Sequence, residues 1–194
     1  MTRNQALELL HKHMKSPNLR KHCYAVEAVM RALYKRLEGV DRSKAMEDKW
    51  AIAGLLHDAD YEETKDDAKN QHTKKVIEWL EELDAKNDVK DAVVSHAWGY
   101  VDGAPRPKTK MQWALYCCDE LTGLIVAVAL VKPDKKLASV SIDSVMKKWN
   151  SLSFAAGVNR KQIEECTPRL KIPLREFVEV ALSAMQGAHT DLGL

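Results

Sequence analysis

The sequence has 194 residues, of which 45% are hydrophobic and 30% are charged, an ordinary balance for a globular protein. This length is enough for one domain with a substantial buried core. The formal net charge of +2, from 30 basic and 28 acidic residues, is too small to indicate nucleic-acid binding or attraction to an anionic membrane. We therefore expect no membrane association and no specific nucleic-acid partner, and the composition leaves the oligomeric state open.

Cysteine usage and apolar segments bear on the location of the protein. Cys23, Cys117, Cys118 and Cys166 show no C-x-x-C spacing, so we expect reduced and mostly buried thiols. The amino-terminal segment MTRNQALELLHKHMK is amphipathic and lacks the apolar stretch of a signal peptide. The apolar run 121–131 is too short to cross a bilayer. These features predict a cytoplasmic protein.

The first part of the chain shows the spacing of amphipathic helices. A short helix is predicted over residues 3–14. Ser16 and Pro17 supply the cap and the first turn of a longer helix that ends at Gly39. Ser43 can cap a third helix, which runs to about His57.

A polar segment, DADYEETKDD, is predicted to be a loop that leads into further helices. The next helix carries Val76, Trp79, Leu80 and Leu83 on one side, and another spans about 88–98 and stops at a glycine. The Gly- and Pro-rich loop GYVDGAPRPKTK is the clearest break in the chain.

The most apolar predicted helix follows this loop, over about 111–131, and we expect it to be central. Prolines and glycines divide the last third into smaller helices, and Pro173 opens the final one, which ends near Gly187. The prediction is an all-α protein. It consists of a helical bundle over residues 1–131 and a helical C-terminal extension over 132–194, packed together as one structural unit.

Six polar residues fall on faces of these helices that should be buried. His22 shares a stripe with Leu19 and Val26, and His72 shares a face with Val76. Three further positions behave alike: His96 lies on an apolar face, Asp119 lies within LYCCDELTGLIVAVAL, and the pair His57-Asp58 ends an apolar helix.

Each of these residues, taken alone, is explained by an ordinary hydrogen bond or ion pair in the core. Burying four histidines and two aspartates without a shared partner would cost many kcal/mol. One shared cation compensates all six at once. The other histidines, His11, His13 and His189, lie near the termini and are predicted to be solvated.

The order His22, His57-Asp58, Asp119 on successive helices resembles the H…HD…D signature of the HD superfamily of metal-dependent phosphohydrolases. The resemblance covers about residues 15–131 and is strongest to small stand-alone HD proteins. It implies an all-α HD-domain bundle that holds a metal between its helices.

The resemblance also implies roles for individual residues. It assigns His22, His57, Asp58 and Asp119 to one metal. His72 and His96 fall where some HD proteins have ligands of a second metal, with the aspartate of the HD pair bridging the two ions. Direct contact of these two histidines with a substrate phosphate is the alternative, and the sequence leaves it open.

Imidazole and carboxylate ligands without thiolates suit one or two ions of Mn, Fe, Co, Ni, Zn or Mg. Such an ion would lower the pKa of a bound water from about 15.7 towards neutrality. We assign catalytic roles to Asp58 and to Glu62, with Asp60 and Glu63 as further candidates for the proton donor.

Substrate binding is predicted at a basic loop, through Arg106 and Lys108, although its composition favours a solvated loop. The leading hypothesis is a metal-dependent phosphohydrolase that cleaves a small phosphate ester, with a nucleotide as the candidate substrate. One alternative is a di-iron HD-fold oxygenase, and another is a non-catalytic helical binding module stabilised by its metal. The sequence lacks a G-Y-P-type motif after the HD pair, which argues against a cyclic-dinucleotide phosphodiesterase.

Overall fold

The computed structural model describes residues 1–39 and 43–194, and within these ranges it contains helices and no strands. The prediction of an all-α fold is therefore confirmed. The elements are α1 (Arg3–His13), α2 (Pro17–Glu38), α3 (Lys44–Leu56), α4 (Tyr61–Thr64), the 3-10 turn η1 (Lys65–Asp67), α5 (Ala68–Gln71), α6 (Lys74–Glu82), α7 (Asn87–His96), α8 (Lys110–Leu130), the 3-10 turn η2 (Leu137–Ser139), α9 (Ile142–Trp149), α10 (Arg160–Glu164), α11 (Cys166–Leu170), α12 (Leu174–Gly187) and α13 (His189–Leu192).

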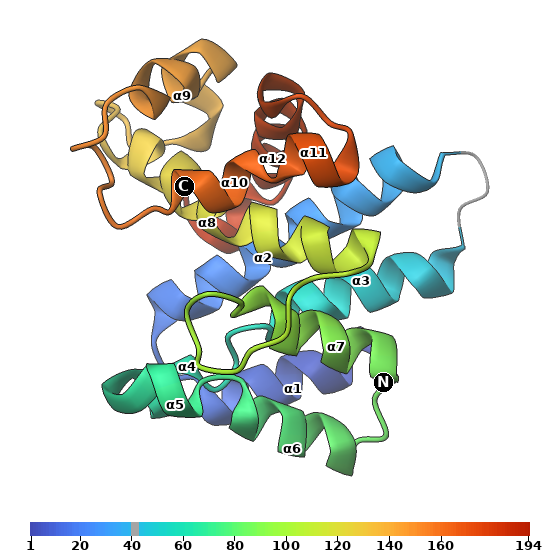
Figure 1. Ribbon diagram of the computed structural model, residues 1–194. Coiled ribbons are helices and arrows are strands. Elements are labelled where there is room, and N and C mark those ends of the chain that lie inside the picture. The colour runs from blue at the N-terminus through green and yellow to red at the C-terminus, as the bar shows by residue number, and fades with distance from the viewer. Residues whose placement is uncertain (40–42) are drawn as a thin grey trace.

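Helices α2, α3 and α8 form the middle of the molecule (Figure 1). Figure 1 shows α1 and α4–α7 on one side of them and α9–α12 on the other. Helix α2 packs against α3, α8 and α12, while α7 packs against α3 and α8. The middle helices therefore contact both outer groups, and they are in a position to gather side chains from several segments.

Local signals explain how α2 begins and ends. The Ser16 side chain accepts a hydrogen bond from the Leu19 amide at 3.5 Å, and Pro17 occupies the first turn, where no amide hydrogen is needed. The helix ends at Gly39, whose φ of +61° favours glycine. These boundaries are the ones predicted.

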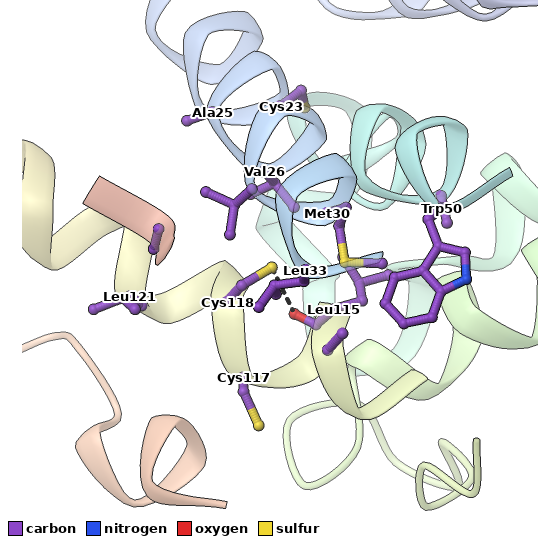
Figure 2. Close-up of a cluster of buried hydrophobic side chains, with 14 of the residues drawn as sticks. Cys23, Ala25, Val26, Met30, Leu33, Trp50, Leu115, Cys117, Cys118 and Leu121 are labelled. Atoms are coloured by element: carbon purple, nitrogen blue, oxygen red, sulfur yellow. Dashed lines mark hydrogen bonds between the residues drawn. The ribbon is translucent and has the colours of Figure 1, made fainter. Parts of the chain in front are cut away.

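Helix α8 is the central helix, as predicted, and its first turn is closed by a reciprocal cap between Thr109 and Gln112. By length and composition it could cross a membrane, but 67% of its most apolar window is buried inside the protein. Leu115 and Cys118 pack against Leu33 and Met30 of α2 (Figure 2). All four cysteines are free thiols in buried positions, which agrees with the reduced and mostly buried thiols predicted for them.

Two predictions about the segment after α2 need correction. Ser43 precedes α3, but its side chain makes no capping hydrogen bond; its carbonyl accepts from the Met46 and Glu47 amides instead. The polar segment 58–67 is not an open loop, because it contains α4 and η1. Asp60 begins this structure by accepting hydrogen bonds at its carbonyl from the amide and the hydroxyl of Thr64.

His72 does not lie on the helix predicted for it. It caps the end of α5 with a ψ of 141°, two residues before α6 begins, and Thr73 follows it with a left-handed φ of 73°. Leu83, assigned to the buried face of that helix, is 40% exposed. His72 nevertheless points inward, as the sequence spacing predicted. The turn between α5 and α6 directs it there, and not the helix that was expected.

The C-terminal helices pack onto the middle of the molecule. Helices α10, α11 and α12 all contact α8, and α12 and α13 contact α2. Pro173 precedes α12 as predicted, although the short α13 follows it. The division of the chain at residue 131 stays a prediction.

Gly54 sets the distance between α2 and α3. A Cβ at this position would lie 2.9 Å from the Val26 carbonyl oxygen and 3.0 Å from Cγ of Met30. We expect Gly54→Ala to lower the free energy of unfolding by about 2 kcal/mol, because the clash outweighs the gain of about 1 kcal/mol in helix propensity. Urea unfolding of the metal-free protein measures this change.

Gly123 is the matched control, since it also lies within a long helix. A Cβ there would meet only Cγ2 of Val158, at 4.0 Å. Gly123→Ala should therefore raise stability by roughly 0.5–1 kcal/mol. Stabilisation by both substitutions would show that α2 and α3 do not need the close approach at Gly54.

Candidate metal centre

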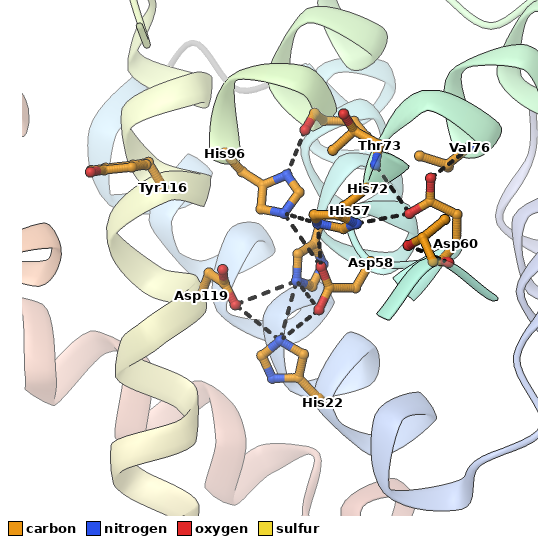
Figure 3. A network of polar contacts seen from close by, with 12 residues as sticks. His22, His57, Asp58, Asp60, His72, Thr73, Val76, His96, Tyr116 and Asp119 are labelled. Atoms are coloured by element: carbon orange, nitrogen blue, oxygen red, sulfur yellow. Dashed lines mark hydrogen bonds and ion pairs between the residues drawn. The ribbon is translucent and has the colours of Figure 1, made fainter. Parts of the chain in front are cut away.

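The structure brings together all six inward-facing polar residues identified in the sequence. They come from five places in the chain but meet beside the middle of α8 (Figure 3). His22 lies on α2, His57 caps α3, Asp58 follows it, His72 lies between α5 and α6, His96 ends α7 and Asp119 lies on α8.

One half of the cluster is formed by two imidazoles and two carboxylates. The Nε2 atoms of His22 and His57 are 3.2 Å apart. Oδ1 of Asp119 lies 3.0 Å from the first and 3.4 Å from the second. Oδ2 of Asp58 completes this half, 3.7 Å from Nε2 of His22 and 3.5 Å from Nε2 of His57.

The other carboxylate oxygen of Asp58 faces a second pair of imidazoles. Its Oδ1 lies 3.2 Å from Nε2 of His72 and 3.3 Å from Nε2 of His96, and these two nitrogens are 3.2 Å apart. Asp58 thus lies between two groups of ligand-type atoms and presents one oxygen to each (Figure 3).

The outer nitrogens of the rings determine which tautomer each histidine adopts. Nδ1 of His57 donates to the Gly54 carbonyl at 2.8 Å, and Nδ1 of His96 donates to the Val93 carbonyl. Nδ1 of His72 faces the Asp60 carboxylate at 2.9 Å. A hydrogen on Nδ1 leaves Nε2 of a neutral ring as a lone pair.

His22 reaches the same state through a hydroxyl group. The Thr122 hydroxyl donates its one hydrogen to the Asp119 carbonyl at 2.8 Å, so it accepts from Nδ1 of His22 at 3.2 Å. All four histidines therefore direct Nε2 lone pairs into the cluster. Hydrogen bonds of this kind to the outer nitrogen are typical of histidines that bind metals.

Lone pairs facing each other at 3.2 Å repel unless a cation or a proton lies between them. Ligand atoms bound about 2.1 Å from one ion lie about 3.0–3.4 Å apart in octahedral or tetrahedral coordination. The separations in each half of the cluster are close to this range. The donor atoms and their spacing fit a divalent ion in either half.

The carboxylates hold protons on His57 and His72 when no metal is bound. Burial lowers the pKa of His57, but Asp58 and Asp119 more than compensate, and the pKa rises to about 9. Burial likewise opposes the effect of Asp58 and Asp60 on His72, whose pKa rises to about 10. Burial disfavours the charged carboxyl of Asp58, but the surrounding histidines outweigh it and hold the pKa well below its usual range.

A cleft of about 490 Å³ opens onto the cluster. The cluster is partly accessible there, since the side chains of His22, Asp119 and Asp58 are 25%, 20% and 16% exposed. The cleft wall is rich in hydroxyl, aromatic and amide groups, and no lysine or arginine of the described residues lines it. The wall outside the cluster consists of Tyr61, Ala97, Trp98, Gly99, Tyr100, Tyr116, Glu120, Gly123, Gly157, Asn159 and Gln162.

Glu62, predicted to be a catalytic acid, lies away from the cluster. Its Oε2 accepts hydrogen bonds from the amides of Lys15 at 2.7 Å and Ser16 at 2.9 Å, at the start of α2. These two amides precede the first helical turn and need an acceptor. The carboxylate is therefore occupied in holding α4 to α2, and we correct its assignment.

Arg106 and Lys108, predicted to bind substrate, are not among the residues that line the cleft. The Arg106 guanidinium packs against Trp98 and Trp113, 5.3 and 5.6 Å from the ring centroids. The Lys108 amide donates to the Gln112 side chain at the start of α8. Neither residue is therefore part of the cleft wall, and a contact of their side chains with substrate stays a prediction.

Asp60 has a role at the site that its sequence position did not reveal. It is fully buried, and its Oδ1 accepts from His72 and from the Thr73 amide, while Oδ2 accepts from the Val76 amide at 3.2 Å. The Asp60 carboxylate therefore has two roles: it orients the His72 ring, and it caps the start of α6. The distance of twelve residues between Asp60 and His72 carries no periodic signal, so only the fold could pair them.

Tyr61 and Tyr100 are also new members of the site. The Tyr61 ring packs edge-on to His72 with centroids 5.5 Å apart, and both tyrosines line the cleft. Burial, and then the neighbouring Tyr100, raises the pKa of Tyr61, so its hydroxyl keeps its proton. Both side chains carry hydroxyl groups that can donate hydrogen bonds.

The fold and the site together define the class of protein. It is an all-α protein that gathers four histidines and two aspartates into a centre suited to metal ions. The comparison with protein families matches the HD domain over residues 19–121, more than half of the chain and all six residues of the cluster. The chain belongs to the HD domain family, as the sequence resemblance predicted. HD domains bind divalent metals and are commonly metal-dependent phosphohydrolases. Comparisons with curated proteins and with solved structures gave no match.

The raised pKa values of His57 and His72 predict how the stability of the chelated protein depends on pH. Their contribution is complete below about pH 6.5, the pKa of histidine in the unfolded chain, and is lost as the pH rises through about 9 and 10. Asp58 and Asp119, with lowered pKa values, stabilise the fold above about pH 4 and lose that effect in stronger acid.

Stability without metal should therefore be greatest between about pH 4 and 6.5, and should fall by a few kcal/mol towards pH 10. Urea unfolding after exhaustive dialysis against a chelator measures it. The metal-loaded protein is the control, and it should be flatter above pH 6.5 because a bound ion replaces the protons. A chelated protein that is equally stable at both ends of this range would contradict the arrangement of charges.

Asp60→Asn tests the link between this buried carboxylate and His72. An amide cannot accept all three hydrogen bonds, so we expect a loss of about 1–3 kcal/mol in stability and of about 10- to 100-fold in metal affinity at His72 and His96. Melting temperature and elemental analysis after dialysis measure the two effects. Glu62→Gln is the matched control and should leave the metal content unchanged; loss of metal from this control would restore Glu62 to the site.

Proposed function

We propose that the protein is a metal-dependent phosphohydrolase that cleaves a small phosphate ester. The observation that carries this proposal is the position of Asp58, whose two carboxylate oxygens face two separate pairs of imidazole lone pairs. Membership of the HD domain family supports it.

In this proposal, Asp58 would contribute to both of two divalent-ion sites. His22, His57 and Asp119 would hold one ion, and His72 and His96 would hold the other. Such ions, when bound, neutralise phosphate charge and make a bound water acidic enough to act as a nucleophile near neutral pH. Mn, Fe, Co, Ni, Zn and Mg all remain suitable for these donor atoms.

The residues of the cleft would bind and orient the substrate. Tyr61 and Tyr100 replace Glu62 as the groups that can donate a hydrogen bond or a proton to the leaving oxygen. The Glu120 carboxylate accepts from the Asn159 amide at 3.0 Å and so fixes the segment before α10 as a wall of the cleft. This wall limits the access of water to the reacting group.

A nucleotide remains the candidate substrate. Trp98 and Tyr116 line the cleft with ring centroids 5.5 Å apart, and aromatic rings of this kind can stack on a base. The proposal includes a cytoplasmic location, in keeping with four buried free cysteines.

A di-iron oxygenase is the second candidate, because a carboxylate shared between two histidine-rich groups also suits two iron ions. The two functions differ in what they consume. A hydrolase releases phosphate without oxygen, whereas an oxygenase retains iron, is coloured and consumes O₂. A screen of nucleotides and sugar phosphates for phosphate release, run beside oxygen uptake with the same metal-loaded protein, separates them.

Metal stoichiometry of single variants tests the shared position of Asp58. We expect Asp58→Ala to lose all bound metal and activity, because its carboxylate contacts both halves of the cluster. His72→Ala and His96→Ala should each lose about one metal equivalent and keep the other. Elemental analysis and phosphate-release kinetics measure these outcomes.

His11→Ala is the control, since His11 lies on α1 and faces Tyr24 at 2.6 Å, away from the cluster. Full metal content in Asp58→Ala would refute the proposal. Unchanged stoichiometry in both His72→Ala and His96→Ala, with a raised KM, would instead assign those two histidines to substrate binding.

A further inference from the structure

A second cavity, of about 960 Å³, lies next to the cleft and is larger than it. The two share the lining residues His22 and Gly123, so they adjoin at one edge of the histidine cluster. Its other walls come from α2, from α8 and the turn that follows it, and from the segment around α13. A molecule at the cluster can therefore extend along α8 into this second cavity.

Three lysines converge on the second cavity. Lys21 precedes His22 on α2, while Lys135 and Lys136 lie in the turn between α8 and η2. Among residues 1–39 and 43–194, no carboxylate lies within 4.0 Å of any of the three ammonium groups. Like charges gathered around one space repel each other, and an anion bound there would relieve the repulsion.

Backbone contacts shape the segments that carry these lysines. The Lys21 ammonium lies close to Gly193, with Nζ 2.7 Å from where a Cβ of that residue would be. Lys135 has a left-handed φ of 54°, and the carboxylate of Asp134 accepts hydrogen bonds from the Lys136 amide and the Ser139 hydroxyl. The one aspartate that lines the cavity is thus engaged in shaping the turn. The Ser139 hydroxyl and, to a smaller extent, the nearby charge of Lys136 lower the pKa of its carboxyl.

Part of the cavity wall is apolar. Val126, Leu130 and Leu192 line the cavity, and half of the Leu130 side chain is exposed. Gly123 lies at the junction, one turn after Asp119, where packing does not require a glycine because a Cβ would meet nothing closer than 4.0 Å. A glycine within a helix lowers its stability, and its absent side chain here leaves the junction open.

The cleft itself is lined by no lysine or arginine of the described chain, so the cationic side chains lie in the adjoining cavity. We propose that the two cavities form one groove for a phosphate ester that carries a second anionic group on an apolar body. The ester phosphate lies at the histidine cluster, the apolar body passes Gly123, and the second anionic group lies among Lys21, Lys135 and Lys136. This inference rests on the proposed phosphohydrolase function and narrows its substrate class.

Equilibrium binding tests the groove without requiring a reaction. The probes are alkylphosphonates from propyl to decyl and the α,ω-bisphosphonates of the same chain lengths, titrated calorimetrically into the metal-loaded protein. We expect one range of chain lengths at which the bisphosphonate binds at least about tenfold more tightly than the monophosphonate. The preference should weaken as ionic strength rises, because the lysines are partly exposed. The ω-carboxyalkylphosphonates distinguish a carboxylate from a phosphate as the second group.

A variant combining Lys21→Gln, Lys135→Gln and Lys136→Gln should lose the preference and keep its affinity for the monophosphonate. The matched control combines Lys12→Gln, Lys132→Gln and Lys147→Gln, which removes the same charge from residues that line neither cavity. Gly123→Leu should also lose the preference, and Gly123→Ala should keep it. Equal binding of the two probes by the wild type, or an undiminished preference in the first variant, would overturn the groove.

The outcomes separate this inference from the proposed function. A lysine-dependent preference in a protein that hydrolyses no phosphate ester would support the groove and refute the hydrolase. Metal-dependent hydrolysis of alkyl phosphates with equal affinity for both kinds of probe would support the hydrolase and refute the groove.

Discussion

The site depends on one constraint: four imidazole rings direct Nε2 lone pairs at the two oxygens of a single carboxylate, that of Asp58. Carbonyl, carboxylate and hydroxyl groups take the Nδ1 hydrogens of all four rings, so none of the rings can turn away without losing a hydrogen bond. The Nε2 lone pairs repel one another when the four rings are neutral and no ion is bound. Protons on the rings or a bound cation remove this repulsion. Proton binding and metal binding therefore compete for one centre, which links metal affinity, stability and pH.

The helices around the cluster are arranged to meet this constraint. Gly54 lets α3 approach α2 closely, and its carbonyl then accepts the Nδ1 hydrogen of His57. Thr122 on α8 orients His22 from the opposite side. The same contacts that pack the middle of the molecule thus fix the ligand geometry, so a change in packing at Gly54 should reach the site through the backbone.

Much of this fold could be predicted from the sequence, because its signals are local. Apolar spacing, the cap at Ser16 and the glycine at the end of α2 lie within a few residues of what they determine. The inward direction of His22 and Asp119 followed from helical periodicity alone. Glu62 could not be placed in this way, since its partners are the amides of Lys15 and Ser16, which are close only in the folded chain.

The same limit explains why the charged residues were harder to assign than the histidines. Arg106 lies in a basic loop, yet its guanidinium packs on Trp98 and Trp113, and it is not itself among the residues that line the cleft. Lys21 directly precedes a cluster histidine, but nothing in the sequence predicts a role for it, because one lysine on a helix is ordinarily solvated.

In the folded protein, Lys21 lines the same cavity as Lys135 and Lys136, which lie in a turn more than a hundred residues later in the sequence. Positive charge near a metal-type centre would weaken cation binding if it were close, and it would contribute little to substrate binding if it were remote. The three lysines line an adjoining cavity and do not line the cleft, so their charges lie beside the cluster and not among its ligands. Selection between phosphate esters can then reside in the distance between two charged sites, while the chemistry remains with the histidines and Asp58.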